Sequence, residues 1–279
     1  MSCFYPRDAW KARRLNENGR RPIVFRRSEG YEDMALQVPC GKCDGCKADK
    51  ALTWALRCAN EASLYDRNCF LTLTYDDNHL PADGKIHVED LQVFFKRLRH
   101  KADIRYYACG EYGGQTKRPH YHALIFGQDF KSASNVEINA DLYSDPALCE
   151  WWGFGSVVAA PFSMASACYV AGYVAKKVGD EDSFQVMSRR PGIGKAWIQK
   201  YWKEVAVSGK VVVEGREYPC PARYIAWMEE ELKHVKLERA RHFKNMPIEK
   251  ICDLPRERRA REITAKQRVN HQRLNKSKV

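Results

Sequence analysis

The 279-residue sequence predicts an α+β fold, with a central antiparallel sheet flanked by helices on one face. Segments that alternate like strands are interleaved with segments whose apolar residues recur at helical spacing. The composition, with 44% hydrophobic and 11% aromatic residues, excludes a generally disordered chain. We expect a Cys-rich amino-terminal segment and a basic carboxy-terminal tail to lie outside this core.

The predicted core begins with a helix over residues 47–65, in which Leu52 and Leu56 belong to a helical apolar pattern. A strand follows over residues 69–75, where β-branched and apolar residues alternate. The next segment, 88–100, has its apolar residues on one side and its basic residues off that side. This pattern predicts an amphipathic helix that packs on the sheet.

The second half of the core contains two strands, 104–112 and 120–126, which a short connection joins. This arrangement predicts a hairpin. A fourth strand is expected over 156–160 and an Ala-rich helix over 163–178. Strands and helices in this order are typical of an α+β fold with an antiparallel sheet.

The net charge of +12 is concentrated near the carboxy-terminal end. Residues 231–279 contain 15 Lys or Arg against 6 Asp or Glu, whereas the preceding 230 residues contain 32 against 29. Two interpretations remain open: a solvated tail, or an arm that binds a polyanion by releasing counterions from its phosphates. We divide the chain into a Cys-rich segment (1–47), a globular domain (48–230) and a basic helical or disordered tail (231–279).

No apolar run in the sequence approaches 18 residues, and the first 14 residues lack the apolar stretch of a secretory signal. We therefore expect a protein without a membrane partner that acts in the cytoplasm. In that compartment most of the 11 cysteines would be reduced or bound to metal.

The strongest chemical signal is the sequence His120-Tyr121-His122 in the predicted strand 120–126. Side chains alternate along a strand, so the two imidazoles share one face, roughly 7 Å apart, and can converge on one ion. Glu111 ends the preceding strand and lies opposite the pair if the two strands form a hairpin. Two imidazoles and a carboxylate suit Mg²⁺ or Mn²⁺ in a catalytic site. The alternative is a pair of structural histidines beside a surface glutamate.

Tyr169 and Tyr173 are four residues apart in the predicted helix 163–178, so they share one face. Lys176 and Lys177 follow in the same segment. Two tyrosines on a helix are by themselves usually packing residues. Beside a metal that polarises a phosphate, or beside a lysine, a phenol becomes a candidate nucleophile.

Three cysteines with regular spacing, Cys40, Cys43 and Cys46, lie at the end of a segment, 1–46, that we expect to be irregular. Cys3 offers a fourth thiolate. A structural zinc site with these four ligands would stabilise an amino-terminal segment that lacks a core of its own. An iron–sulfur cluster and unligated reduced cysteines are the alternatives.

Arg189, Arg190 and Lys195 are further candidates for contact with DNA phosphates, together with Lys177. Residues 192–195 resemble a phosphate-binding loop only superficially. They lack the first glycine and the Ser or Thr of a Walker motif, so the sequence does not support ATPase activity.

Several of these segments together resemble the HUH endonucleases, which carry two histidines around a bulky hydrophobic residue and a helix with a nucleophilic tyrosine. Within that superfamily the sequence is similar to the replication initiators of the Microviridae, the small single-stranded-DNA phages, of the gokushovirus type. The matching stretches are residues 39–47, 70–76, 109–113, 118–122, 169–177 and 187–194. They occur in the order found in the family.

The resemblance implies that residues 48–230 form an HUH domain with an RRM-like sheet, which makes a metal-assisted nick in single-stranded DNA at a replication origin. The Glu-His-His set matches the family's ligands for Mg²⁺ or Mn²⁺. Tyr173 matches the nucleophile of a Tyr-x-x-Lys motif that ends at Lys176, and Tyr169 matches the second tyrosine of two-tyrosine members. The order in which the two tyrosines act stays open.

The family mechanism implies a 5′-phosphotyrosyl link and a free 3′-OH that primes rolling-circle synthesis, followed by joining without ATP. Implied partners are the single-stranded origin and the replication helicase and polymerase of the host.

Other functions remain as alternatives. A transposase or a plasmid initiator of the HUH type would have the same site. A non-catalytic, zinc-stabilised protein could bind nucleic acid through the basic tail. Histidine-triad hydrolases and metallo-β-lactamases are disfavoured because Leu124 and Ile125 stand where their patterns require other residues.

Overall fold

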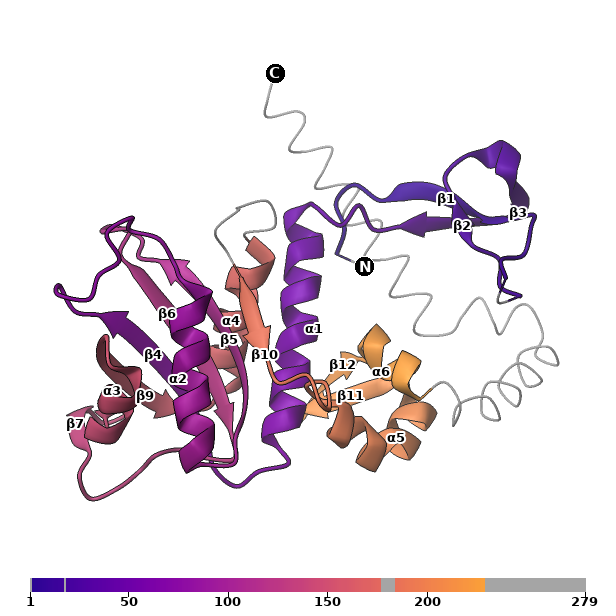
Figure 1. The fold of residues 1–279 in the computed structure, drawn as a ribbon. Coiled ribbons are helices and arrows are strands. Elements are labelled where there is room, and N and C mark those ends of the chain that lie inside the picture. The colour runs from indigo at the N-terminus through magenta and orange to yellow at the C-terminus, as the bar shows by residue number, and fades with distance from the viewer. Residues whose placement is uncertain (1, 18, 177–183, 229–279) are drawn as a thin grey trace. The chain divides into compact units, whose positions relative to one another are not determined.

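The computed structural model describes residues 2–17, 19–176 and 184–228, and from residue 173 to 176 it describes the backbone alone (Figure 1). The chain divides into two compact units, of which one extends to Lys50 and the other begins at Ala51. The basic tail predicted over 231–279 lies outside the described residues. The division at residues 47 and 230 therefore stays a prediction.

The first unit contains a small antiparallel sheet. In it, β1 (Arg7–Ala12) lies between β2 (Ile23–Val24) and β3 (Gly30–Val38), and the short helix η1 (Arg27–Glu29) precedes β3. The expectation that residues 1–46 are irregular was wrong. Most side chains of these strands are exposed, so the sequence lacks the apolar alternation that usually indicates a strand.

The second unit is built on a seven-stranded sheet in the order β10-β5-β6-β4-β9-β8-β7, in which every pairing is antiparallel (Figure 1). The strands are β4 (Asn68–Tyr75), β5 (Arg105–Tyr112), β6 (Pro119–Phe126), β7 (Val136–Asn139), β8 (Leu142–Ser144), β9 (Gly155–Pro161) and β10 (Gln185–Met187). The predicted α+β class, with its central antiparallel sheet, is confirmed.

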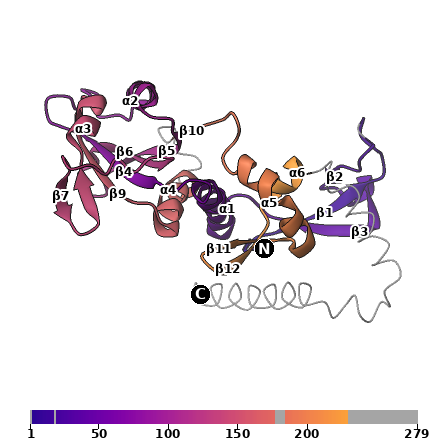
Figure 2. The same ribbon diagram turned by 90° about the horizontal axis from the view of Figure 1, so that it is seen from below.

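Helices cover both faces of this sheet (Figure 2). On one face lie α2 (Val88–Lys101) and α3 (Pro146–Trp152), and on the other lie α1 (Asp44–Ala62) and α4 (Met164–Lys176). Placing all helices on one face was therefore wrong.

The central strands explain why both faces need a cover. In β6, Tyr121, Ala123 and Ile125 belong to the core under α2 and α3, while Leu124 and Phe126 belong to the core under α1 and α4. All five side chains are fully buried. A strand that is apolar on both sides must bury both sides, whereas the pattern of the helices alone does not reveal this.

A third group of apolar side chains, which includes Ile198, Val205 and Tyr224, packs around Leu56 of α1. It is formed by elements that the sequence analysis did not predict, namely α5 (Lys195–Ser208), β11 (Lys210–Val213), β12 (Arg216–Pro219) and α6 (Ala222–Trp227). Among the described helices, none combines the length and the apolar character needed to cross a membrane.

Candidate active site and metal centres

The hairpin of β5 and β6 brings the predicted metal ligands together. Glu111 pairs with His120 across the two strands, and Cys109 pairs with His122. Both histidines lie on the face of β6 that α4 covers, because their positions differ by two residues. The expected convergence of Glu111, His120 and His122 is thus present in the structure.

The three side chains are close enough to share one ion. The Nε2 atom of His120 is 2.6 Å from Oε1 of Glu111, and Nε2 of His122 is 3.0 Å from the same oxygen. One ligand atom from each residue lies within 4.8 Å of the other two. Glu111 and His122 are buried, with 3% and 5% of their surface exposed.

Hydrogen bonding at His120 fits a cation between the imidazole and the carboxylate. Its Nδ1 lies 3.1 Å from the carbonyl oxygen of Arg118, so Nδ1 carries a hydrogen and donates it. In a neutral ring Nε2 then presents a lone pair to Oε1 of Glu111, and two acceptors 2.6 Å apart repel each other unless a proton or a metal ion lies between them.

Glu111 has two further properties of a ligand. Its second oxygen, Oε2, is buried and makes no hydrogen bond within the described part of the chain, which leaves a lone pair for an ion. Burial raises the pKa of this carboxyl, but the hydrogen bonds from His120 and His122 outweigh burial and lower the pKa to about 2. The group is therefore a carboxylate at neutral pH, as coordination of Mg²⁺ or Mn²⁺ requires.

The first of the two predicted tyrosines lies at this site. Tyr169 projects from α4, and its hydroxyl donates a hydrogen bond of 3.3 Å to Oε1 of Glu111. Its ring meets the ring of His122 edge to face, with 5.1 Å between the centroids. The side chain is 43% exposed, so the phenol is accessible to a substrate.

Two residues of β4 that the sequence analysis did not select complete the site. Thr72 pairs with His122 across β4 and β6, and its hydroxyl lies 3.1 Å from Nδ1 of that imidazole. Phe70 stacks on His122 with a centroid distance of 5.3 Å and also touches Tyr169 edge to face. Alternation was the available signal, since alternate residues of a strand beside the His pair share its face.

Other predicted site residues have different locations. Tyr173 and Lys176 lie on the backbone of α4, but their side chains are outside the described structure, as is Lys177 altogether. Arg189 and Arg190 follow β10 near the end of β5 that begins at Arg105, so they are not near the ligand set. Lys195 is the first residue of α5.

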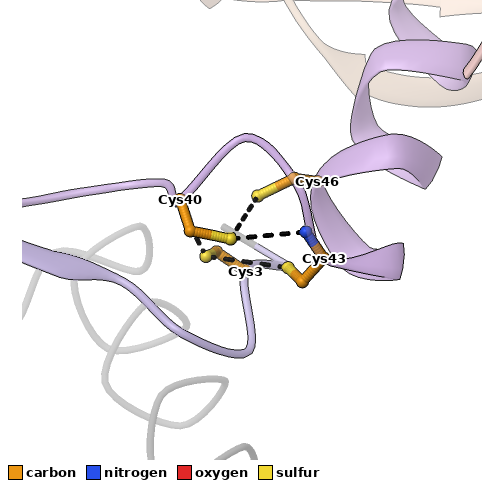
Figure 3. A group of neighbouring side chains, drawn as sticks. All are labelled: Cys3, Cys40, Cys43 and Cys46. Carbon is orange, nitrogen blue, oxygen red and sulfur yellow. Dashed lines mark hydrogen bonds between the residues drawn. The ribbon is translucent and has the colours of Figure 1, made fainter. Parts of the chain in front are cut away.

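The second candidate metal centre lies in the first unit, where four cysteines surround one point (Figure 3). Their sulfur atoms all lie within 4.8 Å of one another. The Sγ atoms of Cys40 and Cys46 are 3.9 Å apart, and those of Cys3 and Cys43 are 3.8 Å apart. Four thiolates about 2.3 Å from a tetrahedral zinc ion would be about 3.8 Å apart, so the cluster has the dimensions of a single-ion site.

Backbone amides support the charged form of two of these thiols. The amides of Phe4 and Cys43 point at Sγ of Cys43 and Cys40, at 3.3 and 3.4 Å. Burial raises the pKa of Cys43, but the amides of Phe4 and Cys46 outweigh it, so that the pKa falls to about 6. A thiolate at neutral pH is the form that binds zinc.

The amino terminus is attached to the start of α1 beside this cluster. Both the amide and the hydroxyl of Ser2 donate to the carboxylate of Asp49, at 3.1 and 2.6 Å. Gly45 makes this approach possible, since a Cβ atom at that position would lie only 1.8 Å from the carbonyl oxygen of Ser2. The glycine inside the Cys-rich motif thus lets Cys3 reach the other three cysteines.

Comparison with known proteins gives one matching family. The family model whose description begins "Replication-associated protein ORF2" matches residues 68–178, a range that contains the Glu-His-His set and Tyr169. No solved structure matches the chain.

Three curated relatives carry similar names. "Replication-associated protein VP4" of Bdellovibrio phage phiMH2K is 34% identical over 249 residues, which are 81% of this chain and 77% of the relative. "Replication-associated protein ORF4" of Chlamydia phage 1 is 31% identical over 69% of the chain, and "Replication-associated protein ORF2" of Spiroplasma virus 4 is 29% identical over 60%. The aligned regions span 54% and 57% of these two relatives.

Proposed function

The chain belongs to the replication-associated proteins of microviruses, and from this membership we propose that it initiates phage replication by nicking and rejoining single-stranded DNA. One observation carries the proposal. Glu111, His120 and His122 converge on one point, and the accessible hydroxyl of Tyr169 lies 3.3 Å from the same carboxylate. Ligands for a divalent ion and a phenol side by side are the parts that a phosphoryl transfer to tyrosine needs.

The three ligands would hold Mg²⁺ or Mn²⁺ while a scissile phosphate enters from the open side near Tyr169. A divalent ion there would polarise the phosphate and stabilise the charge that develops on its oxygens. Phe70 and Thr72 keep the ring of His122 in place, and the carbonyl of Arg118 keeps that of His120 in place. This second layer of contacts orients the ligating nitrogens.

In the proposed step a phenolic oxygen forms a bond to phosphorus while the bond between phosphorus and the 3′ oxygen breaks. The phenol gives up its proton and the 3′ oxygen takes one up, which leaves a 5′-phosphotyrosyl ester and a 3′-OH. The energy of the ester is retained, so a later attack by a 3′-OH can rejoin the strand. Tyr173 is the proposed nucleophile by its place in the motif, with Lys176 beside it, and Tyr169 is the proposed second tyrosine.

Glu111 is better suited to hold an ion than to take the proton of the phenol. A tyrosine hydroxyl has a pKa near 10, whereas that of Glu111 is about 2. Proton transfer between them would cost about 11 kcal/mol, since each pKa unit corresponds to about 1.4 kcal/mol. The hydrogen bond from Tyr169 therefore marks proximity and not general-base catalysis.

We assign the four cysteines to structural zinc. The spacing of their sulfurs fits one tetrahedral ion, and the thiolates of an iron–sulfur cluster are held apart by several iron atoms. We further propose that the protein works in the host cytoplasm, where the host helicase and polymerase would extend the 3′-OH.

The proposal is tested with circular single-stranded DNA that carries the origin region of the phage genome encoding this chain. Purified protein and Mn²⁺ should give a covalent protein–DNA band that resists boiling in detergent. EDTA and His120→Ala should each abolish it, because both remove the ion. Tyr201→Phe is the matched control, since it removes an equivalent phenol from α5 and should leave the band unchanged.

A covalent band that persists in EDTA or in His120→Ala would remove the ion from the mechanism. Wild-type protein that binds this DNA without forming any band would reduce the function to DNA binding.

A further inference from the structure

An open groove of about 940 Å³ lies at the end of β5 opposite to Glu111. It runs between the last turns of α2 and the segment that follows β10. Four arginines line it, which we call the arginine groove: Arg99, Arg105, Arg189 and Arg190. The lining contains a single carboxylate, that of Asp103. Such an excess of guanidinium groups favours an anion with several charges.

Two of the four arginines are held in fixed positions. The guanidinium of Arg99 lies over the ring of Tyr106, 4.9 Å from its centroid, and reaches the hydroxyl of Ser188 at 3.4 Å. Arg105 forms an ion pair with Glu61 of α1 and donates a bond of 2.7 Å to the carbonyl of Pro191. Fixed guanidinium groups lose little entropy when they bind a phosphate.

The segment that carries the other two arginines is attached to α1. Oε2 of Glu61 accepts a bond of 2.6 Å from the amide of Gly194, and Arg57 donates two bonds, of 3.1 and 3.0 Å, to the carbonyl of Ile193. Arg57 and Glu61 are buried polar residues, so this attachment is specific. Arg189 and Arg190 are exposed just before it and form no ion pair with any described residue.

The groove is suited to phosphates and not to bases. The ring of Tyr106 is stacked on Phe95 at 3.7 Å and is covered by Arg99, so it offers no free face to a base. A neighbouring groove of about 410 Å³ adds Lys96 and His100 beside Arg99. Guanidinium groups bind phosphate oxygens in pairs and carry no base preference.

We propose that the arginine groove holds the phosphate backbone of single-stranded DNA outside the cleavage site. The inference rests on the proposed function for the identity of the anion. Tyr106 and Glu111 are five residues apart on β5, so the groove and the metal site are about 17 Å apart along the strand. The groove would thereby hold a flank of the DNA, independently of its sequence, while another part of the strand occupies the metal site.

The test measures binding of fluorescent oligo(dT) of 30 nucleotides to the full chain in EDTA over a range of salt concentrations. Each phosphate contact contributes about 0.7 to the slope of log affinity against log salt. Arg189→Ala with Arg190→Ala should lower the slope by about 1.4 and the affinity by at least tenfold at about 0.1 M salt. The matched control removes two exposed charges from α5, with Lys200→Ala and Lys203→Ala, and should change neither value.

A second variant separates charge from geometry. Arg189→Lys with Arg190→Lys should retain the slope but bind more weakly than the wild type, because lysine keeps the charge and loses the paired donors. An unchanged slope in the double alanine variant would overturn the proposal, and so would an equal loss in the Lys200 and Lys203 control. Binding in EDTA requires no cleavage, so this result is separate from failure of the covalent assay.

Discussion

Each imidazole of the metal site uses one ring nitrogen for contact with the protein and turns the other toward Glu111. His120 is oriented by the carbonyl of Arg118 and His122 by the hydroxyl of Thr72. These partners decide which nitrogen has a lone pair for an ion. The chemistry at this scale therefore depends on residues that never touch the metal.

Thr72→Val should weaken metal binding without disturbing the strand, since Val has nearly the same shape as Thr. Loss of the partner at Nδ1 of His122 should lower the affinity for Mn²⁺ about 10- to 100-fold. Titration calorimetry measures this. Thr74→Val is the matched control on the same strand, because the Thr74 hydroxyl bonds to Ser156 and not to a histidine. Equal affinities in Thr72→Val and the wild type would contradict the role assigned to Thr72.

The lowered pKa of Glu111 predicts a dependence of stability on pH in the presence of EDTA. A carboxyl with a pKa of about 2 in the folded state and about 4.5 in the unfolded state stabilises the fold above pH 4.5, and this contribution is lost as the pH falls toward 2. Between pH 5 and pH 3 the free energy of unfolding of the wild type should fall more steeply than that of Glu111→Gln, with a total contribution of up to about 3 kcal/mol. Urea titrations measure the difference. The exposed control Glu204→Gln should follow the wild type, and parallel curves for Glu111→Gln would refute the assigned environment.

At the scale of elements, α1 serves three parts of the chain. Its first turn contains Cys46 of the cysteine cluster, its apolar face packs on the sheet, and Arg57 and Glu61 hold the segment that follows β10. A sequence pattern reveals the apolar face. It does not reveal that two charged residues in the same helix are buried, because their partners are 136 and 133 residues away in the chain.

Gly45 provides a test of the cysteine cluster as a metal site. Gly45→Ala should lower the zinc content of the purified protein well below one ion per chain, because the added methyl group would collide with the carbonyl of Ser2 and displace Cys3. Elemental analysis measures the zinc. Gly114→Ala is the control, since a Cβ atom there meets nothing within 4 Å. Full zinc content in Gly45→Ala would mean that Cys3 is not a required ligand.

The core strands and helices were predictable because each has a strong period of its own. The strand expected over 120–126 is observed as β6 over 119–126, and the helix expected over 88–100 as α2 over 88–101. Elements without such a period escaped prediction, for example β7, whose four side chains are all exposed, and β10, which has three residues. The metal site was predictable because a hairpin fixes which residues face each other. The arginine groove was not, because it depends on contacts between distant segments.

At the scale of the whole molecule, charge and chemistry are separate. Residues before 231 carry nearly balanced charge, and most of the net +12 belongs to residues 231–279. The site that would cut DNA is thus in a nearly neutral part of the chain. Affinity for DNA would come from basic segments at other positions, which contact phosphates and not bases.

Deletion of residues 251–279 should reduce the salt dependence of DNA binding, because nine Lys or Arg are lost against three Asp or Glu. The slope of log affinity against log salt should become smaller by about 0.7 for each phosphate contact removed. Fluorescence anisotropy with oligo(dT) measures this. A chain of full length in which these nine residues are replaced by Gln should behave like the deletion. If both variants keep the slope of the wild type, the tail plays no part in binding.

The most direct test of the central claim is to find which residue becomes attached to DNA. Wild-type protein is incubated with Mn²⁺ and labelled circular single-stranded origin DNA, and the labelled peptide is identified by mass spectrometry after nuclease digestion. The label should be on Tyr173 or Tyr169, and no adduct should form when both are replaced by Phe. A label on any other residue, or an adduct that survives the double replacement, would contradict the account.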